Sequence, residues 1–253
     1  MIAEKIKLLV SDFVFVILRN DAIKFGYIKK EKEPNINGLL NKLIPNLVYF
    51  RKLRREEIHD ILKYEYQRDD TEKIYECVNT VIDRVYFSDE ELNLLEETVW
   101  LRPTKENMGL FDEIEESESK ITGQSASVYI RGLLNEYVRL PEYKRETLVF
   151  DDELYDFAEA ARTGKIFHST VNGKSIRMFA FHYVYGFAYD QNNYLIGYDL
   201  TNKVIGAIPL CKIRDSYVVE RKYKPSEQLI SMLQNYYEEK EYDKVIAYEE
   251  ELC

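Results

Sequence analysis

The stretch "KIFHSTVNGKSIRMFAF", residues 165–181, decides the fold of the second half of the chain. Its apolar and polar residues alternate on both sides of Asn172-Gly173, and this dipeptide is the strongest short signal for a β-hairpin turn. Two further strands are expected around turns at 190–193 and 201–203, and a last strand in "CKIRDSYVVE", residues 211–220. Five short strands over about 60 residues are typical of a small closed barrel.

The rest of the chain has a helical pattern. Apolar residues recur at largely helical spacing in 56–87, a helix is expected at 151–162, and the acidic tail 226–251 is also predicted to be helical. The predicted fold class is therefore α+β, with a largely helical N-terminal half that contains short ribbon strands, a five-stranded barrel and a helical C-terminal extension. The expected divisions are 1–150, 151–224 and 225–253.

A partial repeat runs through the N-terminal half. Residues 37–57, "NGLLNKLIPNLVYFRKLRREE", and 131–147, "RGLLNEYVRLPEYKRET", share GLLN, an apolar run with proline, and a basic cluster ending in Arg-Glu. Strand-like segments precede the copies at 22–30 and 97–105, and an amphipathic helix is expected at 108–117. Strand, helix and longer helix form the ribbon-helix-helix pattern, in which two paired strands enter the DNA major groove. The alternative is that GLLN is a common helix start and that the match is coincidental.

The two copies could pair with each other or across a homodimer. We expect Trp100 to lie in the core. The residues that could face a groove from the ribbon are Lys24, Tyr27, Lys29, Arg102 and Lys105.

Charge is distributed in blocks along the chain. The net charge is −10, yet residues 1–60 carry +4 and residues 161–225 carry +6, whereas 61–160 carry −14 and 226–253 carry −6. A basic block can bind a polyanion locally, because salt screens charges beyond roughly 10 Å. The three cysteines are scattered and no signal peptide is visible, which predicts a cytoplasmic protein with reduced thiols. The apolar run 8–18 is too short to cross a bilayer and is predicted to be core.

The segment "NNYLIGYDL", residues 192–200, resembles the third strand of the WYL domain. Tyr194 and Leu195 match the second and third letters of the family's triplet, and Asn193 stands in place of tryptophan. Other matches are Arg177 in the hairpin, His182 soon after it, and Lys212 with Arg214 in "PLCKIRD". The resemblance covers about 60 residues and the helix on either side.

The resemblance implies an Sm-like five-stranded barrel that senses a nucleic acid or nucleotide-like ligand in a basic groove. Family members often follow a DNA-binding domain in transcriptional regulators. A subset in type VI CRISPR loci, with a ribbon-helix-helix in front, is similar to an accessory protein that binds single-stranded RNA and stimulates the RNA-guided nuclease.

The candidate binding residues combine basic and aromatic side chains. Arginine grips phosphate bidentately, histidine can donate to it near neutral pH, and tyrosine rings can stack on bases. Phe179, Phe181 and Phe187 are expected in the core. The predicted ligand-binding residues are Lys165, His168, Lys174, Arg177, His182, Tyr183, Tyr185, Tyr194, Lys212 and Arg214, and a second basic patch is predicted at Arg51, Lys52, Arg54 and Arg55.

The sequence contains no recognised catalytic motif, and its three histidines never occur at metal-ligand spacing. We therefore predict a non-enzymatic protein without metal or cofactor. The favoured function is nucleic-acid-linked regulation of transcription, through a barrel that binds a single-stranded nucleic acid or a nucleotide. The alternatives are a single-stranded-RNA-binding accessory of a type VI CRISPR system, and a protein–protein docking module. A homodimer with no membrane association is expected, and duplex DNA is a further candidate partner.

Overall fold

The computed structural model describes residues 5–30, 32–66, 94, 97–118, 125–186 and 192–239. The chain divides into two compact units, the N-terminal unit Met1–Leu140 and the C-terminal unit Pro141–Cys253. Residues 67–87 of the expected helix 56–87 lie outside the described residues. The boundary expected at residue 150 falls ten residues after this division, and the expected three-part division stays a prediction.

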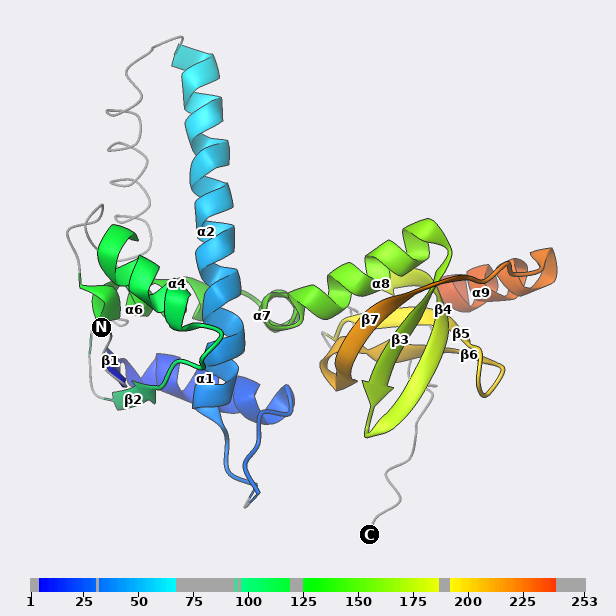
Figure 1. Ribbon diagram of the computed structural model, residues 1–253, viewed down its shortest axis with the longest axis horizontal. Coiled ribbons are helices and arrows are strands. Elements are labelled where there is room, and N and C mark those ends of the chain that lie inside the picture. The colour runs from blue at the N-terminus through cyan, green and yellow to red at the C-terminus, as the bar shows by residue number, and fades with distance from the viewer. Residues whose placement is uncertain are drawn as a thin grey trace. The chain divides into compact units, whose positions relative to one another are not determined.

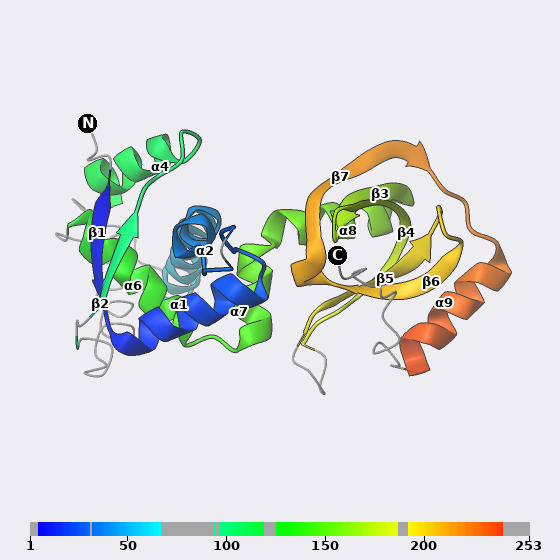
Figure 2. The ribbon, with the colours of Figure 1, turned by 90° about the horizontal axis from the view of Figure 1, so that it is seen from below.

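The N-terminal unit contains the same order of elements twice. The first set is β1 (Ile6–Val10), α1 (Asp12–Lys24) and α2 (Ile36–Tyr66). The second set is β2 (Glu97–Leu101), α4 (Met108–Glu113) with the π-helical turn η2 (Ile114–Glu118), and α6 (Ala126–Val138). Strands β1 and β2 form an antiparallel ribbon (Figure 2). In its register Leu8 lies opposite Val99. The two sets therefore pair with each other within one chain.

Residues 22–30 do not form the strand that the sequence analysis predicted. Ser11 caps α1, because its hydroxyl accepts the Val14 N–H at 3.3 Å, and the helix then continues to Lys24. Its buried face includes Val14, Leu18 and Ala22 at helical spacing, which fixes this segment as helix. Beyond the helix, residue 28 forms one isolated bridge with residue 34. The first strand of the ribbon is instead β1, from the apolar run that was expected to be core.

The GLLN repeat supplies the core of the N-terminal unit. Leu39 and Leu40 of α2 and Leu133 and Leu134 of α6 are all fully buried. Asn41 of the first copy has a second role, since its Nδ2 donates to the carbonyl of residue 102 and its Oδ1 accepts the N–H of residue 104, both at 2.9 Å. The repeat therefore builds the core and fixes the chain that leaves β2.

The C-terminal unit begins with two helices, α7 (Glu142–Val149) and α8 (Asp151–Thr163), and continues into five strands. The strands are β3 (Lys165–Val171), β4 (Lys174–Val184), β5 (Tyr194–Asp199), β6 (Val204–Pro209) and β7 (Ile213–Lys222), with the 3₁₀ turn η3 (Leu210–Lys212) before β7. Asn172 and Gly173 both have positive φ, 48° and 75°, as a type I′ turn requires. The predicted hairpin is confirmed.

The five strands form one antiparallel sheet in the order β6-β5-β4-β3-β7. The sheet is strongly curled (Figure 2), but no hydrogen-bonded pairing joins β6 to β7 among the described residues. The closed barrel therefore stays a prediction, whereas the mixed α+β class and the five-stranded sheet are confirmed. Helix α8 packs on the sheet (Figure 1). The rings of Phe157 and Phe167 meet there, with centroids 5.4 Å apart. The acidic tail begins as α9 (Glu227–Glu239), which packs against β5 and β6.

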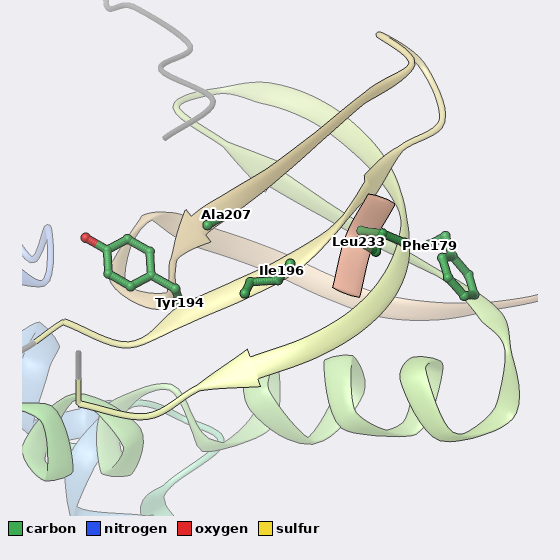
Figure 3. Close-up of a cluster of buried hydrophobic side chains, with 5 residues drawn as sticks. All are labelled: Phe179, Tyr194, Ile196, Ala207 and Leu233. Carbon is green, nitrogen blue, oxygen red and sulfur yellow. The ribbon is translucent and has the colours of Figure 1, made fainter. Parts of the chain in front are cut away.

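One core cluster of the C-terminal unit joins the sheet to α9. It contains Phe179, Tyr194, Ile196, Ala207 and Leu233 (Figure 3). Tyr194 is only 3% exposed, so the expectation that its ring faces outward for a ligand is wrong. Its strand is buried along nearly its whole length, because the neighbours β4 and β6 flank it and α9 covers it.

A register shift interrupts the alternation of side chains along β4. The pairing of β4 with β5 is irregular between Ala180 and His182, so side chains on either side of this point do not keep strict alternation. Phe179 is buried as predicted and Phe181 is half-buried against the same cluster. Phe187 lies outside the described residues.

Candidate nucleic-acid interface

Two of the predicted ligand-binding side chains and one neighbouring side chain lie in one row across the sheet. Pairing places His168 of β3 opposite Arg177 of β4 on one side and opposite Tyr217 of β7 on the other. Partners that lie directly opposite each other in an antiparallel pair have Cβ atoms only about 4.5–5.5 Å apart and project on the same face. Arg177 is exposed, and Tyr217 is 52% exposed. The row therefore presents a cation, an imidazole and a phenol ring together.

The imidazole of this row is held from two directions. The rings of His168 and Tyr217 are stacked, with centroids 4.4 Å apart and planes inclined by 25°. The Oγ of Ser175 lies 2.9 Å from His168 Nε2. Partial burial, and then the positive charge of Arg177, hold the pKa of His168 below its ordinary value. The lowered pKa favours the neutral imidazole, and a nearby anion would favour the protonated form.

Several other predicted basic residues have intramolecular roles instead. Lys165 donates to Glu220 at 2.9 Å and lies 3.9 Å from Glu159, so its charge is balanced. Arg214 donates to two backbone carbonyls and lies with its guanidinium carbon 5.2 Å from the ring centroid of Phe150. Lys174 and Lys212 are exposed, the first beside the hairpin turn and the second in η3. Arg177 is thus the clearest basic group of the row.

His182 does not join this row. It lies five residues beyond Arg177 on β4, a separation of about 17 Å along a strand. Its ring stacks on Tyr237 of α9 at a centroid distance of 4.2 Å, and its Nδ1 lies 2.7 Å from the carbonyl of residue 183. His182 is exposed, but its observed contacts fix α9 to the sheet rather than build one site with Arg177.

The two tyrosines after His182 also lie apart from the row. Tyr183 is half-buried, and burial raises the pKa of its phenol. Tyr185 is 48% exposed, but its ring packs edge-on against Tyr143 of α7 at 4.8 Å. The structure therefore splits the ten predicted residues, and it brings His168 and Arg177 together.

Asn193, where the WYL triplet has tryptophan, is a buried structural clamp. Its backbone N–H and its Nδ2 donate to Glu146 Oε2 at 3.1 and 2.6 Å, and its Oδ1 accepts the Gly186 N–H at 2.9 Å. Glu146 Oε1 accepts the Cys211 N–H at 2.8 Å. Burial raises the pKa of Glu146, and the N–H groups of Asn193 and Cys211 offset part of this effect. One carboxylate thus fixes α7 to the start of β5 and to η3.

The predicted second basic patch is only partly at the surface. Arg51 and Arg55 are 4% and 7% exposed, since they lie on the buried face of α2, and Arg51 lies over the ring of Tyr129. Lys52 is half-buried and bonded to Glu113, and Arg54 is exposed. Four cations in the sequence therefore do not give four surface charges.

The predicted ribbon residues lie beside the ribbon rather than in it. Lys24 ends α1, Tyr27 and Lys29 follow it, and Arg102 and Lys105 come after β2. The outward face of the ribbon carries Lys7, Leu9, Thr98 and Trp100. Trp100 is 52% exposed, so its predicted place in the core is wrong: the alternation of β2 buries Val99 and Leu101 and turns Trp100 outward.

Sequence reasoning missed Tyr217 and Ser175. Alternation within β7 could have found Tyr217 as an exposed ring, but only the register to β3 places it beside His168. Among the described residues, no group of three or more His, Cys, Asp or Glu side chains could hold a metal ion. No helix in the described part of the chain has both the length and the apolar character needed to cross a membrane.

Comparison with known proteins gives a match in structure alone. No family model and no curated protein sequence matches this chain. A crystal structure of a CRISPR Cas-related protein matches with a TM-score of 0.62 and 15% identity, over 91% of this chain and 66% of that protein. The chain thus spans slightly less than two thirds of that protein's length, and at this identity the similarity shows a shared fold.

The proteasome accessory factor B/C of Arthrobacter aurescens is a second structural match. It gives a TM-score of 0.29 and 12% identity over 51% of this chain and 23% of that protein. This score is too low to define a shared fold.

Proposed function

We propose that this chain is a non-enzymatic regulator that binds single-stranded nucleic acid on the sheet of its C-terminal unit. The observation that carries the proposal is the row of Arg177, His168 and Tyr217 across three adjacent strands. An arginine fork suits a phosphate, and an exposed tyrosine offers a stacking face for a base. A single strand supplies both groups at once, because its bases are not hidden in a duplex.

A CRISPR setting is the favoured biological context of this proposal. The described fold is shared along 91% of the chain with a CRISPR Cas-related protein. The two strand–helix–helix sets precede the five-stranded sheet in the sequence, and the pairing of their strands fits the ribbon-helix-helix region expected there. In this context the protein would be an accessory that binds single-stranded RNA and stimulates an RNA-guided nuclease. A transcriptional regulator would use the same row for a different strand or nucleotide.

The experiment is a fluorescence-anisotropy titration of labelled single-stranded RNA, single-stranded DNA and duplex DNA at two salt concentrations. Arg177→Ala and Tyr217→Ala are compared with wild type, and Lys203→Ala, an exposed residue in the turn between β5 and β6, is the matched control. We expect single-strand binding that weakens steeply with salt, since phosphate contacts release counterions. Arg177→Ala should weaken it about tenfold, the loss of roughly 1.4 kcal/mol from one charge-assisted contact.

Binding to duplex alone, unchanged in Arg177→Ala, would move the function away from this sheet. A complete lack of nucleic-acid binding would refute the proposal and leave the protein-docking alternative. An RNA preference, followed by stimulation of an RNA-guided nuclease in a cleavage assay, would support the CRISPR accessory over the transcriptional regulator.

A further inference from the structure

The N-terminal unit contains a pocket beside the outward face of the ribbon. It measures about 220 Å³ and lies among α1, the segment that leads into α2, and β2. Phe15 and Trp100 contribute aromatic walls, and Asn35, Asn37 and Lys29 contribute polar groups. Drug-sized ligands occupy pockets of roughly 300–1,000 Å³, so this smaller pocket suits one flat ring system.

Two asparagine amides give the pocket a defined hydrogen-bonding character. Asn35 Oδ1 accepts the Gly38 N–H at 3.0 Å, and Asn37 Oδ1 accepts the Arg102 N–H at 2.7 Å. Each oxygen thus accepts one backbone N–H, and among the described residues neither Nδ2 group has a hydrogen-bond partner, so both amides can donate to a ligand. The pocket thus offers hydrogen-bond donors, which favour a ligand with carbonyl oxygens on its ring.

Lysine side chains lie at the pocket and next to its Trp100 wall. The Nζ of Lys5 lies 5.8 Å from the centroid of the Trp100 ring, and Lys7 lies opposite Trp100 in the ribbon. Lys29 lines the pocket itself, and its partner Glu33 is 3.8 Å away with both side chains largely exposed, so this ion pair is weak. An anionic group next to the ring of the ligand would therefore be attracted.

We propose that this pocket binds a nucleotide, with the base stacked on Trp100, a base carbonyl on the asparagine amides and the phosphate at Lys29. The site is separate from the Arg177 row and adds to the proposed function. Base and phosphate can come from a free mononucleotide or from one residue of a single strand. Uracil and guanine carry ring carbonyls that adenine lacks, so UMP and GMP should bind more tightly than AMP.

Duplex DNA fits this surface less well. Side chains that read base edges in the major groove are mainly arginine, lysine, asparagine and glutamine. Of the four outward side chains of the ribbon, Leu9 and Trp100 are apolar and Thr98 is short. An exposed tryptophan next to lysines is instead typical of single-strand and nucleotide recognition, where every base has a face that can stack.

The chain offers a direct reporter, because Trp100 is its single tryptophan. Fluorescence excited where tyrosine does not absorb therefore comes from this pocket alone, and a stacked base quenches it. We would titrate wild type with UMP, GMP, AMP, a short oligouridylate, ribose 5-phosphate, inorganic phosphate and polyglutamate. Quenching by UMP and GMP at lower concentration than by AMP, with none from ribose 5-phosphate or phosphate, is expected. A lower half-saturation for the oligouridylate than for UMP would identify a strand as the source of the base.

Three variants complete the test. Lys29→Glu should weaken UMP quenching about tenfold, whereas Lys224→Glu, an exposed lysine of the C-terminal unit, should leave it unchanged. Trp100→Ala should weaken UMP binding about tenfold through the loss of stacking. Calorimetry would measure this affinity, because the variant has no tryptophan fluorescence. Arg177→Ala should leave the quenching unchanged, so the pocket and the proposed single-strand site on the sheet are tested independently.

Absence of quenching by every nucleotide would overturn the pocket even if single-strand binding that depends on Arg177 persisted. Equal quenching by polyglutamate and UMP would also overturn it, since it would show a general anion surface. Equal affinity of Lys29→Glu and wild type for UMP would contradict the placement of the phosphate.

Discussion

Replacement of Glu146 by glutamine tests whether one buried carboxylate holds the C-terminal unit together. All three recorded bonds to this carboxylate come from N–H donors: the backbone and Nδ2 of Asn193 at Oε2, and the backbone of Cys211 at Oε1. A glutamine in the same place retains one acceptor oxygen and puts an NH₂ group against a donor. Whichever way the amide is turned, at least one buried N–H loses its partner.

The magnitude follows from these bonds. An unpaired buried donor costs about 1–3 kcal/mol, and each retained bond weakens by up to about 1 kcal/mol when its acceptor loses charge. The easier burial of a neutral amide offsets part of this loss, since burial raises the pKa of Glu146. We expect Glu146→Gln to lower the free energy of unfolding of the C-terminal unit by about 3 kcal/mol.

Hydrogen exchange of amides in β3, β4 and β5 would measure this change, because it reports on the C-terminal unit separately from the rest of the chain. Glu227→Gln is the matched control, since Glu227 is an exposed glutamate of α9 in the same unit. Tryptophan fluorescence should report an unchanged N-terminal unit, where Trp100 lies. A Glu146→Gln variant within about 0.5 kcal/mol of wild type would refute the reasoning.

Three further outcomes are expected. His168 has a lowered pKa, so in the free protein its contribution to stability is present above its unfolded pKa and is lost as pH falls. A bound phosphate would instead favour the protonated imidazole, so single-strand affinity should rise on acidification by at most about tenfold per pH unit. Binding isotherms across pH would show this rise, and His168→Gln should remove it. Gly197→Ala would put a Cβ 2.5 Å from the Met178 side chain, and we expect a loss of about 1–3 kcal/mol in chemical denaturation; an unchanged midpoint would contradict this packing. Tyr137→Phe removes the 2.7 Å hydrogen bond that the phenol donates to buried Asp21, and it should lower the free energy of unfolding of the N-terminal unit by about 1–3 kcal/mol. Unfolding monitored by tryptophan fluorescence would measure this loss, with Tyr64→Phe as the exposed control.

Local signals in the sequence were sufficient for most of the C-terminal unit. Asn172-Gly173 defines its own turn through backbone conformations that few other pairs adopt, and alternation then sets the strands on either side. Alternation does not predict which face the side chains at residues 180–182 occupy, because the register shift there depends on the pairing with β5 and is not visible in the sequence of β4. Tyr194 was misplaced for a related reason, since its burial depends on α9, which is distant in sequence.

The N-terminal unit shows the complementary failure. The strand predicted at 22–30 is wrong because the Ser11 cap starts a helix that continues to Lys24, and this cap lies eleven residues before the predicted strand. Trp100 was assigned to the core from its chemistry alone, yet a two-stranded ribbon with helices on one face must expose half of its side chains. Of the three residues in the candidate row, the sequence predicted Arg177 and His168. Tyr217 could not be placed beside them, because only the register between β3 and β7 brings it opposite His168.

Pairing of β1 with β2 inside one chain has a consequence for how recognition can evolve. A ribbon made by two identical chains must present the same side chains twice, and a change on one strand is forced on the other. Here a single mutation alters one strand alone, and the two facing positions hold different residues, Lys7 on β1 and Trp100 on β2. The tether also makes the strands meet at a concentration that does not depend on how much protein the cell contains. The two halves are thus free to specialise, one surface at a time, without loss of assembly.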